Sequence, residues 1–440
     1  MERNKLIEEK LKMINAETGD LIRVARANKR YEGILMPHHA FSQEDIITLK
    51  LKNGYNIGIA VDEKTELTLL EKQKTIKKPS KDIPFDPKKP TISLLGTGGT
   101  IACYVEYRTG AVHPASSAEE LASSVPEIFE FCNVRSQVVY QMLSENMETT
   151  HWQQLAKLVA EELNNGTTGV VIPHGTDTMG YTAAALSFFL KHLSGPVVLV
   201  GAQRSSDRPS SDATNNLLTA ARVAATSDIG EVVVLMHGEI SDSFSTIHRG
   251  TKVRKCHTSR RDAFQTINDF PLGKVQDQTI SFTMPYKKKT QGPVTVDAAV
   301  NDDVAIVYFY PGMKPENIPE KKGLILVGTG LGHISEKLLP RITSLITKGS
   351  VVVMTSQCLF GRVNMNVYSS GRDLVNAGVI SAEDMLPETA YIKLMWVLAH
   401  TTTRKEAENL LSANLAGEIS PRTHIDAYPS FPKEMKQRKC

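Results

Sequence analysis

The sequence predicts an α/β protein in which a small N-terminal β-barrel, SH3-like in size, precedes two doubly wound α/β domains. Two patterns lead to this prediction. Residues 1–78 contain short stretches in which apolar and polar residues alternate, as in the strands of a small antiparallel barrel. From Thr91 onward, unbroken runs of Val, Ile and Leu alternate with helix-forming stretches, which is typical of a parallel sheet covered on both faces. A chain of 440 residues is also too long for one ordinary core.

The N-terminal region, residues 1–78, is predicted to form a short amphipathic helix over 5–14 and then the barrel. Asn53-Gly54 separates two of its strands and is typical of a two-residue hairpin turn. Residues 79–90 are rich in Lys and Pro, as in an extended linker. The predicted strands of the barrel cover 19–26, 31–37, 46–52, 56–61 and 65–70.

Residues 91–285 are predicted to form the larger α/β domain, with the active site, and 321–440 the smaller one. We expect 286–320 to be a linker, and its lysine run at 287–289 to be a solvated loop rather than a nucleic-acid site. The expected strands cover 91–95, 168–172, 196–200, 231–236, 304–309, 323–327 and 351–355. The expected helices cover 149–164, 181–192, 214–226, 334–348 and 389–400.

Composition excludes several classes of protein. The formal net charge of +3 is too small to argue by itself for binding to nucleic acid or to a membrane. No apolar run approaches the roughly 18–20 residues that cross a bilayer, and the charged N-terminus shows no signal peptide. The five cysteines are odd in number and never form CxxC, which favours reduced thiols. We therefore expect a cytoplasmic protein.

Two glycine-flanked threonine loops are the most informative motifs. Thr97-Gly98-Gly99-Thr100 and His174-Gly175-Thr176-Asp177-Thr178 each follow an apolar strand candidate. The carboxyl ends of parallel strands are where ligands bind in open α/β sheets, so both loops are expected at one edge. Hydroxyls, a carboxylate and glycines that free backbone N–H groups point to acyl transfer.

A threonine hydroxyl needs an adjacent base before it can act as a nucleophile. Lys255 is a candidate if burial or a neighbouring charge lowers its pKa. Other interpretations stay open from the residues alone. A glycine-threonine loop is often a tight turn or a phosphate cradle, and a single lysine is usually a surface charge. His174 could be a base or a packing residue. No GxGxxG or GxxxxGK[ST] motif follows, which weakens the nucleotide alternative.

The two loops resemble the signature loops of the asparaginase/glutaminase family. Further landmarks of that family recur in order: Tyr107 on the loop after the first signature, Ser144 and Glu145 in a substrate-binding segment, and Lys255. The resemblance covers roughly 91–400 and implies two α/β domains of asparaginase type.

This resemblance also implies a mechanism without a metal. The Thr97 hydroxyl, assisted by Tyr107, would attack the side-chain amide of the substrate and expel ammonia. Thr176, Asp177 and Lys255 would activate the water that cleaves the acyl-enzyme, although which threonine attacks first is left open. Asp177 would also bind the substrate's α-ammonium group. Ser144 and Glu145 would hold its α-carboxylate, while the alternative for Ser144 is a helix cap.

The N-terminal barrel departs from ordinary asparaginases, and this layout resembles the GatD family, the amidase subunits of the archaeal glutamyl-tRNA(Gln) amidotransferases GatDE. The resemblance implies a glutaminase that supplies ammonia to a GatE-like partner, which converts Glu-tRNA(Gln) to Gln-tRNA(Gln). This chain would need no cofactor, while ATP and Mg would be used by the partner of this ligase complex of protein biosynthesis. We expect a homodimer and, with the partner, a heterotetramer.

Two alternatives remain from the sequence: a stand-alone cytoplasmic L-asparaginase with an extra N-terminal domain, and a binding module that has kept the fold without activity. The smaller domain adds a second departure. Leu331 stands where many family members carry an asparagine that reaches a neighbouring subunit's site. Tyr368 could serve instead. Arg23, Arg26, Lys29 and Arg30 of the barrel could meet a tRNA backbone or be an ordinary solvated edge.

Overall fold

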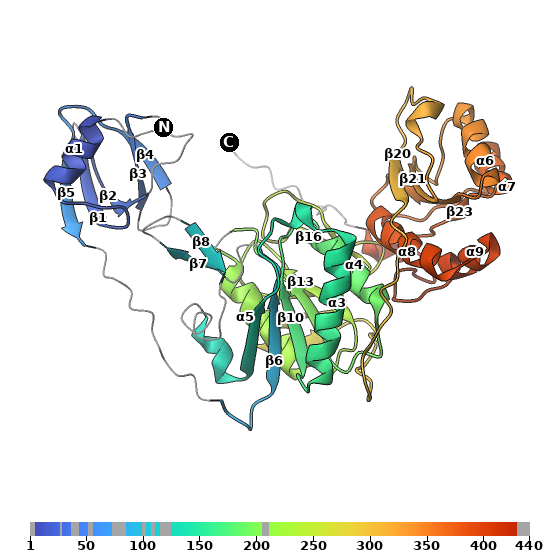
Figure 1. The fold of residues 1–440 in the computed structure, drawn as a ribbon, viewed down its shortest axis with the longest axis horizontal. Helices are drawn as coiled ribbons and strands as arrows, with labels where there is room; N and C mark the ends of the chain where they lie inside the picture. Colours follow the sequence, from blue (N-terminus) through green and yellow to red (C-terminus); the bar gives the residue numbers. More distant parts are fainter. Residues whose placement is uncertain are drawn as a thin grey trace.

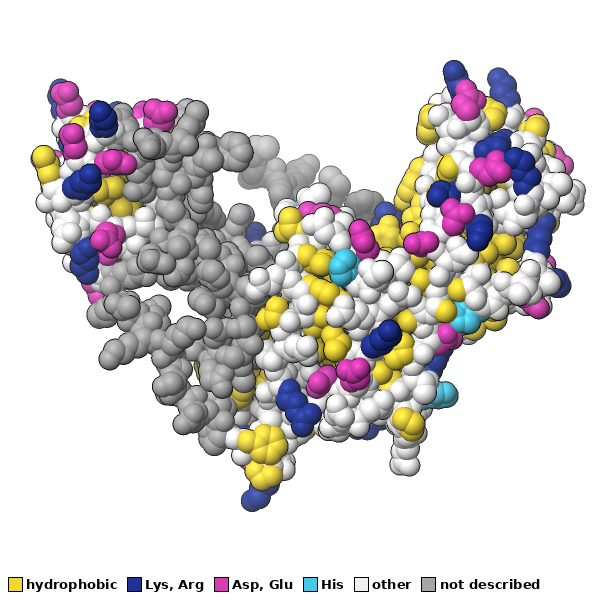
Figure 2. All heavy atoms as spheres, in the orientation of Figure 1, with side chains coloured by type: hydrophobic (Ala, Val, Ile, Leu, Met, Phe, Trp, Pro, Cys, Tyr) yellow, Lys and Arg dark blue, Asp and Glu magenta, His cyan; other side chains and the backbone are white. Residues whose placement is uncertain are grey.

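The computed structural model describes residues 5–26, 29–36, 44–51, 56–72, 85–98, 103–106, 111–114, 125–204 and 211–428 (Figure 1). Within these ranges the chain forms an N-terminal β-rich unit, a large α/β domain and a smaller α/β domain. Among the described residues no helix is both long and apolar enough to cross a membrane. Figure 2 shows basic and acidic side chains interspersed over the small domain, in keeping with the small net charge of +3.

The N-terminal unit is an antiparallel sheet of five strands with one helix. Helix α1 (Lys5–Met13) directs Ile7 and Leu11 into the same core as the inward residues of the strands. The strands pair in the order β4-β3-β2-β1-β5. Asn53-Gly54 lies outside the described residues, but the strands on its two sides pair antiparallel. The strands are β1 (Leu21–Arg26), β2 (Lys29–Leu35), β3 (Ile46–Leu51), β4 (Asn56–Ala60) and β5 (Glu66–Glu71).

The large domain is built on an eight-stranded sheet in the order β18-β17-β14-β13-β12-β10-β6-β9. Five neighbouring strands are parallel: β6 (Thr91–Gly96), β9 (Asn133–Val138), β10 (Gly169–Pro173), β12 (Val197–Val200) and β13 (Val232–His237). Three antiparallel strands extend the sheet beyond β13: β14 (Ser245–Arg249), β17 (Gly273–Gln276) and β18 (Thr279–Phe282). We predicted none of these three strands.

Helices cover both faces of the large sheet, which explains the unbroken apolar runs of its strands. Helices α3 (Thr149–Asn164) and α4 (Met179–Phe189) share one core with Val170 and Ile172 of β10. Helix α5 (Ala213–Thr226) packs on the other face, against Val171. Short strand pairs complete the domain: β7 (Cys103–Glu106) with β8 (Ala111–Pro114), β11 (Leu190–Lys191) with β19 (Thr295–Val296), and β15 (Val253–Lys255) with β16 (Phe264–Thr266).

The small domain is a parallel sheet of four strands in the order β20-β21-β22-β23. Its strands are β20 (Val304–Tyr308), β21 (Gly323–Gly328), β22 (Val351–Ser356) and β23 (Ile380–Ser381), and its helices are α6 (Leu339–Thr347), α7 (Ser369–Ala377), α8 (Pro387–His400) and α9 (Arg404–Ser412). The range 286–320, expected to be a linker, contains β20, so the small sheet begins before 321. The polar residues before β20 suggested a linker, although β20 itself is as apolar as its neighbours.

Helix α8 joins the two α/β domains. Its Ala390 and Leu394 belong to the same apolar core as Met179 and Ala183 of α4. Tyr181 of α4 and Tyr391 of α8 also meet edge to face, with ring centroids 6.4 Å apart. The helix that follows the second signature loop is thereby packed directly on the small domain.

Candidate active site

The two threonine loops lie side by side because the strands before them are parallel neighbours. Strand β6 ends at Gly96 and β10 at Pro173, and the two strands pair in register. Thr97 fixes the junction: its backbone N–H donates to Pro173 O at 3.1 Å, and its hydroxyl donates to the same oxygen at 3.0 Å. The Thr97 side chain is buried, with 2% of the residue exposed. The prediction that both loops share one sheet edge is confirmed.

At two glycines, the segment that contains Met142 and Ser144 packs closely against these loops. Gly98 has a φ of +117°, and a Cβ there would collide with the carbonyl oxygen of Met142. A Cβ on Gly175 would lie 2.7 Å from the Cβ of Ser144. Ser144 is buried, and its carbonyl oxygen accepts a hydrogen bond of 2.6 Å from the Thr178 hydroxyl. Glu145, in the same short helical turn, is exposed. The predicted substrate-binding segment therefore contacts the second loop directly.

Lys255 reaches the second loop from a distant part of the chain. It is the last residue of β15, and its Nζ donates to Thr176 Oγ1 at 2.9 Å and to Asp177 Oδ1 at 2.8 Å. The Lys255 side chain is only 17% exposed, whereas that of Asp177 is 69% exposed. This arrangement joins an amine, a hydroxyl and a carboxylate, which are the groups that proton transfer to and from an oxygen nucleophile requires.

His174 lies in a closed, buried hydrogen-bond chain. Its Nδ1 is 2.6 Å from Gly175 O, which can only accept, so Nδ1 holds the hydrogen. Its Nε2 then accepts from the Thr182 hydroxyl at 2.9 Å, and Trp152 Nε1 donates to that hydroxyl at 3.0 Å. Burial lowers the pKa of His174 to about 4. The ring is therefore neutral near pH 7, both nitrogens are occupied, and His174 fixes the loop rather than acting as a base.

Thr182 and Trp152 were missed by sequence reasoning. Thr182 falls on the buried side of α4 and Trp152 on that of α3, where apolar residues are expected. A buried polar atom needs a hydrogen-bond partner, so the polar groups of these two residues at buried positions were the signal by which the sequence could have identified them. Thr100 of the first loop and Tyr107, predicted to assist Thr97, lie outside the described residues.

Leu331 and Tyr368 belong to the small domain. Leu331 is 36% exposed and Tyr368 is 59% exposed. Tyr368 meets the ring of His333 edge to face, with centroids 5.2 Å apart. This ring contact holds Tyr368 within the small domain of this single chain. The idea that Tyr368 replaces a cross-subunit asparagine stays a prediction.

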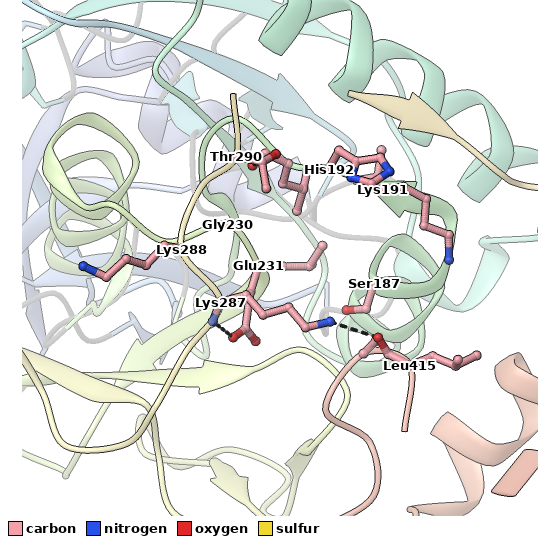
Figure 3. A pocket seen from close by; sticks show the side chains of 13 residues that line it. Ser187, Lys191, His192, Gly230, Glu231, Lys287, Lys288, Thr290 and Leu415 are labelled. Carbon is pink, nitrogen blue, oxygen red and sulfur yellow. Dashed lines mark hydrogen bonds between the residues drawn. The ribbon is translucent and has the colours of Figure 1, made fainter. Parts of the chain in front are cut away.

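A separate pocket of about 300 Å³ lies at the amino end of strand β13, away from the strand ends that carry the threonine loops (Figure 3). Gly230 and Glu231 line it just before β13 begins, whereas the threonine loops follow the carboxyl ends of β6 and β10. Lys287 crosses the pocket, with its N–H on Glu231 and its Nζ on Leu415 O at 2.9 Å. This pocket is therefore distinct from the threonine site. Within the described ranges, no three or more His, Cys, Asp or Glu side chains gather as a metal site would require.

Comparisons with known proteins agree with this architecture. The family profile "Asparaginase, N-terminal" matches residues 91–288, "Glutaminase/Asparaginase C-terminal domain" matches 303–411, and "GatD N-terminal domain" matches 16–70. Among solved structures, the thermostable L-asparaginase from Thermococcus kodakarensis superposes with a TM-score of 0.67 at 30% identity, over 76% of this chain and 100% of that one. L-asparaginase I from Vibrio cholerae gives a TM-score of 0.65 at 31% identity, over 76% and 99%.

The curated relatives match along the whole chain. The GatD subunit of glutamyl-tRNA(Gln) amidotransferase from Pyrococcus furiosus is 53% identical, covering 96% of this chain and 99% of the relative. The protein of the same name from Saccharolobus islandicus is 46% identical, covering 96% and 97%. The shared N-terminal domain distinguishes these relatives from the matched asparaginases, which cover only 76% of the chain. This chain therefore belongs to the GatD family of glutamyl-tRNA(Gln) amidotransferase subunits, with catalytic domains of the asparaginase type.

Proposed function

We propose that this chain hydrolyses the side-chain amide of glutamine and supplies the ammonia to a GatE-like partner, which converts Glu-tRNA(Gln) to Gln-tRNA(Gln). The contact of Lys255 with both Thr176 and Asp177 is the observation on which the amidase chemistry rests. The choice of amidotransferase over asparaginase is supported by similarity to GatD proteins across the N-terminal domain.

In the first half of the reaction, the Thr97 oxygen attacks the amide carbon while Tyr107 takes the hydroxyl proton. The tetrahedral oxyanion needs fixed donors, and backbone N–H groups of the glycine-rich loop suit this role. Collapse of the tetrahedral intermediate breaks the C–N bond. The leaving nitrogen receives from Tyr107 the proton that Thr97 gave up and departs as ammonia, which leaves an acyl ester on Thr97.

In the second half, water cleaves this ester. The Thr176 hydroxyl takes a proton from the attacking water and passes its own proton to the Lys255 amine, and Asp177 stabilises the resulting ammonium group. The proton held by Lys255 returns to the leaving Thr97 oxygen, and the substrate departs as its free acid. Since Asp177 is largely exposed, water weakens its attraction for the amine, and substrate binding over the site strengthens it.

We assign substrate recognition to the exposed side chains of Asp177 and Glu145 and to Ser144. Asp177 binds the α-ammonium group by charge, and the Ser144 hydroxyl donates to the α-carboxylate. Glu145 suits the α-ammonium group better than the α-carboxylate that the family resemblance first suggested for it, because two carboxylates repel each other. The exposed position of Glu145 leaves it free to approach the substrate.

The remaining features of the proposal concern the complex. We propose that the N-terminal sheet is an SH3-like barrel that contacts the partner or the tRNA, and that the chain works in the cytoplasm as a homodimer within a heterotetramer. ATP and Mg act at the partner, where glutamate is activated. The expectation that this chain itself uses no cofactor belongs to the same proposal.

Ammonia release from glutamine and from asparagine tests the proposal, measured for the purified chain alone, with the partner, and with the partner and Glu-tRNA(Gln). We expect release from glutamine to rise when the partner and tRNA are added. Full-rate release from asparagine by the isolated chain, unchanged by either addition, would instead establish a stand-alone asparaginase. Absence of ammonia in every arm would leave the binding-module alternative.

A further inference from the structure

The strand that presents Lys255 is held from its other side by the small domain. Lys255 points to Thr176 and Asp177, whereas its neighbour Arg254 points to helix α8, where its Nε lies 3.4 Å from Glu388 Oε1. Adjacent residues of a strand point to opposite sides, so a force on Arg254 acts through the backbone on Lys255. The catalytic group and the Arg254–Glu388 pair therefore share one short strand.

Strand β15 depends on such contacts because it has little sheet around it. It is three residues long and, within the described part of the chain, pairs only with β16. Just before it, the Thr251 carbonyl accepts a hydrogen bond of 2.9 Å from the Thr389 hydroxyl of α8. Lys252 forms a buried ion pair of 2.7 Å with Asp384, which precedes α8. Three closely spaced tethers to the small domain thus lead up to Lys255.

Glu388 is well placed to act as a fixed point. It lies in the first turn of α8, where a negative charge is favoured by the helix dipole. Its side chain is 17% exposed, and its Oε2 is buried without a hydrogen-bond partner in the described structure. Among the described residues, Arg254 is the cation that pairs with this carboxylate, and losing it would leave a poorly solvated charge unpaired. The pair therefore resists displacement.

The same helix also touches the other half of the catalytic group. Helix α4 begins at Met179, two residues after Asp177, and its Met179 and Ala183 share a core with Ala390 of α8. The amino-terminal half of α8 thus packs against the element that follows Thr176 and Asp177 and, through Glu388, against the strand that ends in Lys255. One helix of the small domain holds both sides of the contact.

We propose that Arg254 and Glu388 are positioning residues for amide hydrolysis: their ion pair sets β15 so that Lys255 Nζ reaches Thr176 and Asp177 together. The kinetic consequence rests on the proposed glutaminase activity, whereas the positional consequence does not. The small domain then acts on the reaction through the position of the catalytic lysine.

Three variants test the pair: Glu388→Gln, Arg254→Met and the double variant. Ammonia release from glutamine is measured with the partner present, per active site and as separate kcat and KM values. We expect each single variant to lose about 10- to 100-fold in kcat, as misplacement by about 1 Å produces, with KM within about twofold. Because the two residues act as a unit, the double variant should be no slower than the slower single variant.

A matched control is Glu320→Gln, which removes an exposed ion pair with Lys348, 2.8 Å long, in the same domain. It should keep the wild-type kcat. A purely structural role would lower the melting temperature and the number of active sites but not kcat per site. Wild-type kcat per site in Glu388→Gln and Arg254→Met, or losses that multiply in the double variant, would overturn the proposal.

A crystal structure of Glu388→Gln gives a result that does not depend on activity. We expect Lys255 Nζ to lie beyond about 3.5 Å from Thr176 Oγ1 or from Asp177 Oδ1, outside hydrogen-bond range. Unchanged contacts to both would refute positioning. If the wild-type chain released no ammonia, the proposed function would fail while this structural comparison still decided the inference.

Discussion

Replacing Thr182 by valine removes the central group of the buried chain that runs from Trp152 to His174. Valine keeps nearly the same volume but lacks the hydroxyl. Trp152 Nε1 then loses its acceptor, and His174 Nε2 loses its donor. Each buried polar group left without a partner costs about 1–3 kcal/mol, so Thr182→Val should lower the free energy of unfolding by about 2–6 kcal/mol.

The matched control for this change is Thr182→Ser. Serine keeps the hydroxyl and loses one buried methyl group, which costs about 1 kcal/mol. Because His174 Nδ1 holds the Gly175 carbonyl, the valine variant should also lower kcat for amide hydrolysis by releasing the loop that contains Thr176. The serine variant should keep most of the activity.

Denaturant unfolding followed by tryptophan fluorescence measures the difference. The chain has two tryptophans, one in each α/β domain, so a Trp396→Phe background reports on Trp152 alone. The stabilising role of the hydroxyl is refuted if Thr182→Val costs no more than Thr182→Ser, since the hydroxyl would then contribute nothing to the stability of the large domain.

The remaining predictions concern the base, the loop and pH. Lys255→Met should reduce ammonia release by about 10²- to 10⁴-fold in a steady-state assay, as loss of a general base does, and near-normal release would remove Lys255 from the mechanism. Gly98→Ala should lower the melting temperature and kcat together, because an L-residue at φ +117° is strained and its Cβ meets Met142 O; an unchanged melting temperature would contradict the close packing. Burial lowers the pKa of His174 to about 4 and that of His248 to about 3, both below the ordinary value of 6.5. Unfolding frees these rings to bind protons, so their stabilisation is complete above pH 6.5 and is lost as pH falls toward 4 for His174 and toward 3 for His248. Protonation linked to His174 alone should lower the free energy of unfolding by about 3 kcal/mol once the pH is below 4. Urea unfolding at pH 7 and pH 4.5 measures most of this change. The change should be smaller in His248→Gln than in the wild type, because the variant lacks the second buried ring.

The placement of the two threonine loops could be predicted because parallel strands share one carboxyl edge. β6 and β10 are unbroken apolar runs, and nothing else was needed to put Thr97 and Thr176 together. The role of Lys255 could not be worked out in this way. Lys255 stands 78 residues after Asp177 in the chain, and from the residues alone it was only a candidate base until the family resemblance supported it. The fold brings it into contact through β15, whose three residues show no distinctive pattern.

Properties that depend on burial could not be predicted from the sequence either. His174 stood equally as a base or as a packing residue, and only its two occupied nitrogens decide the matter. The strands β14, β17 and β18 were missed because polar residues interrupt them, so that none is an unbroken apolar run. β20 was recognised as a strand but placed in a linker, since pairing with β21 cannot be read from local composition.

Transfer of nitrogen from glutamine to tRNA-linked glutamate tests the central claim most directly. Glutamine labelled with ¹⁵N in its amide is supplied to this chain with its partner, ATP, Mg and Glu-tRNA(Gln), and the label is measured in the glutamine released from the tRNA. We predict that the wild-type chain incorporates the label. Lys255→Met should lose this transfer but keep amidation from added free ammonia. Labelled product at the wild-type rate with Lys255→Met, or wild-type hydrolysis with no label on the tRNA, would contradict the proposed function.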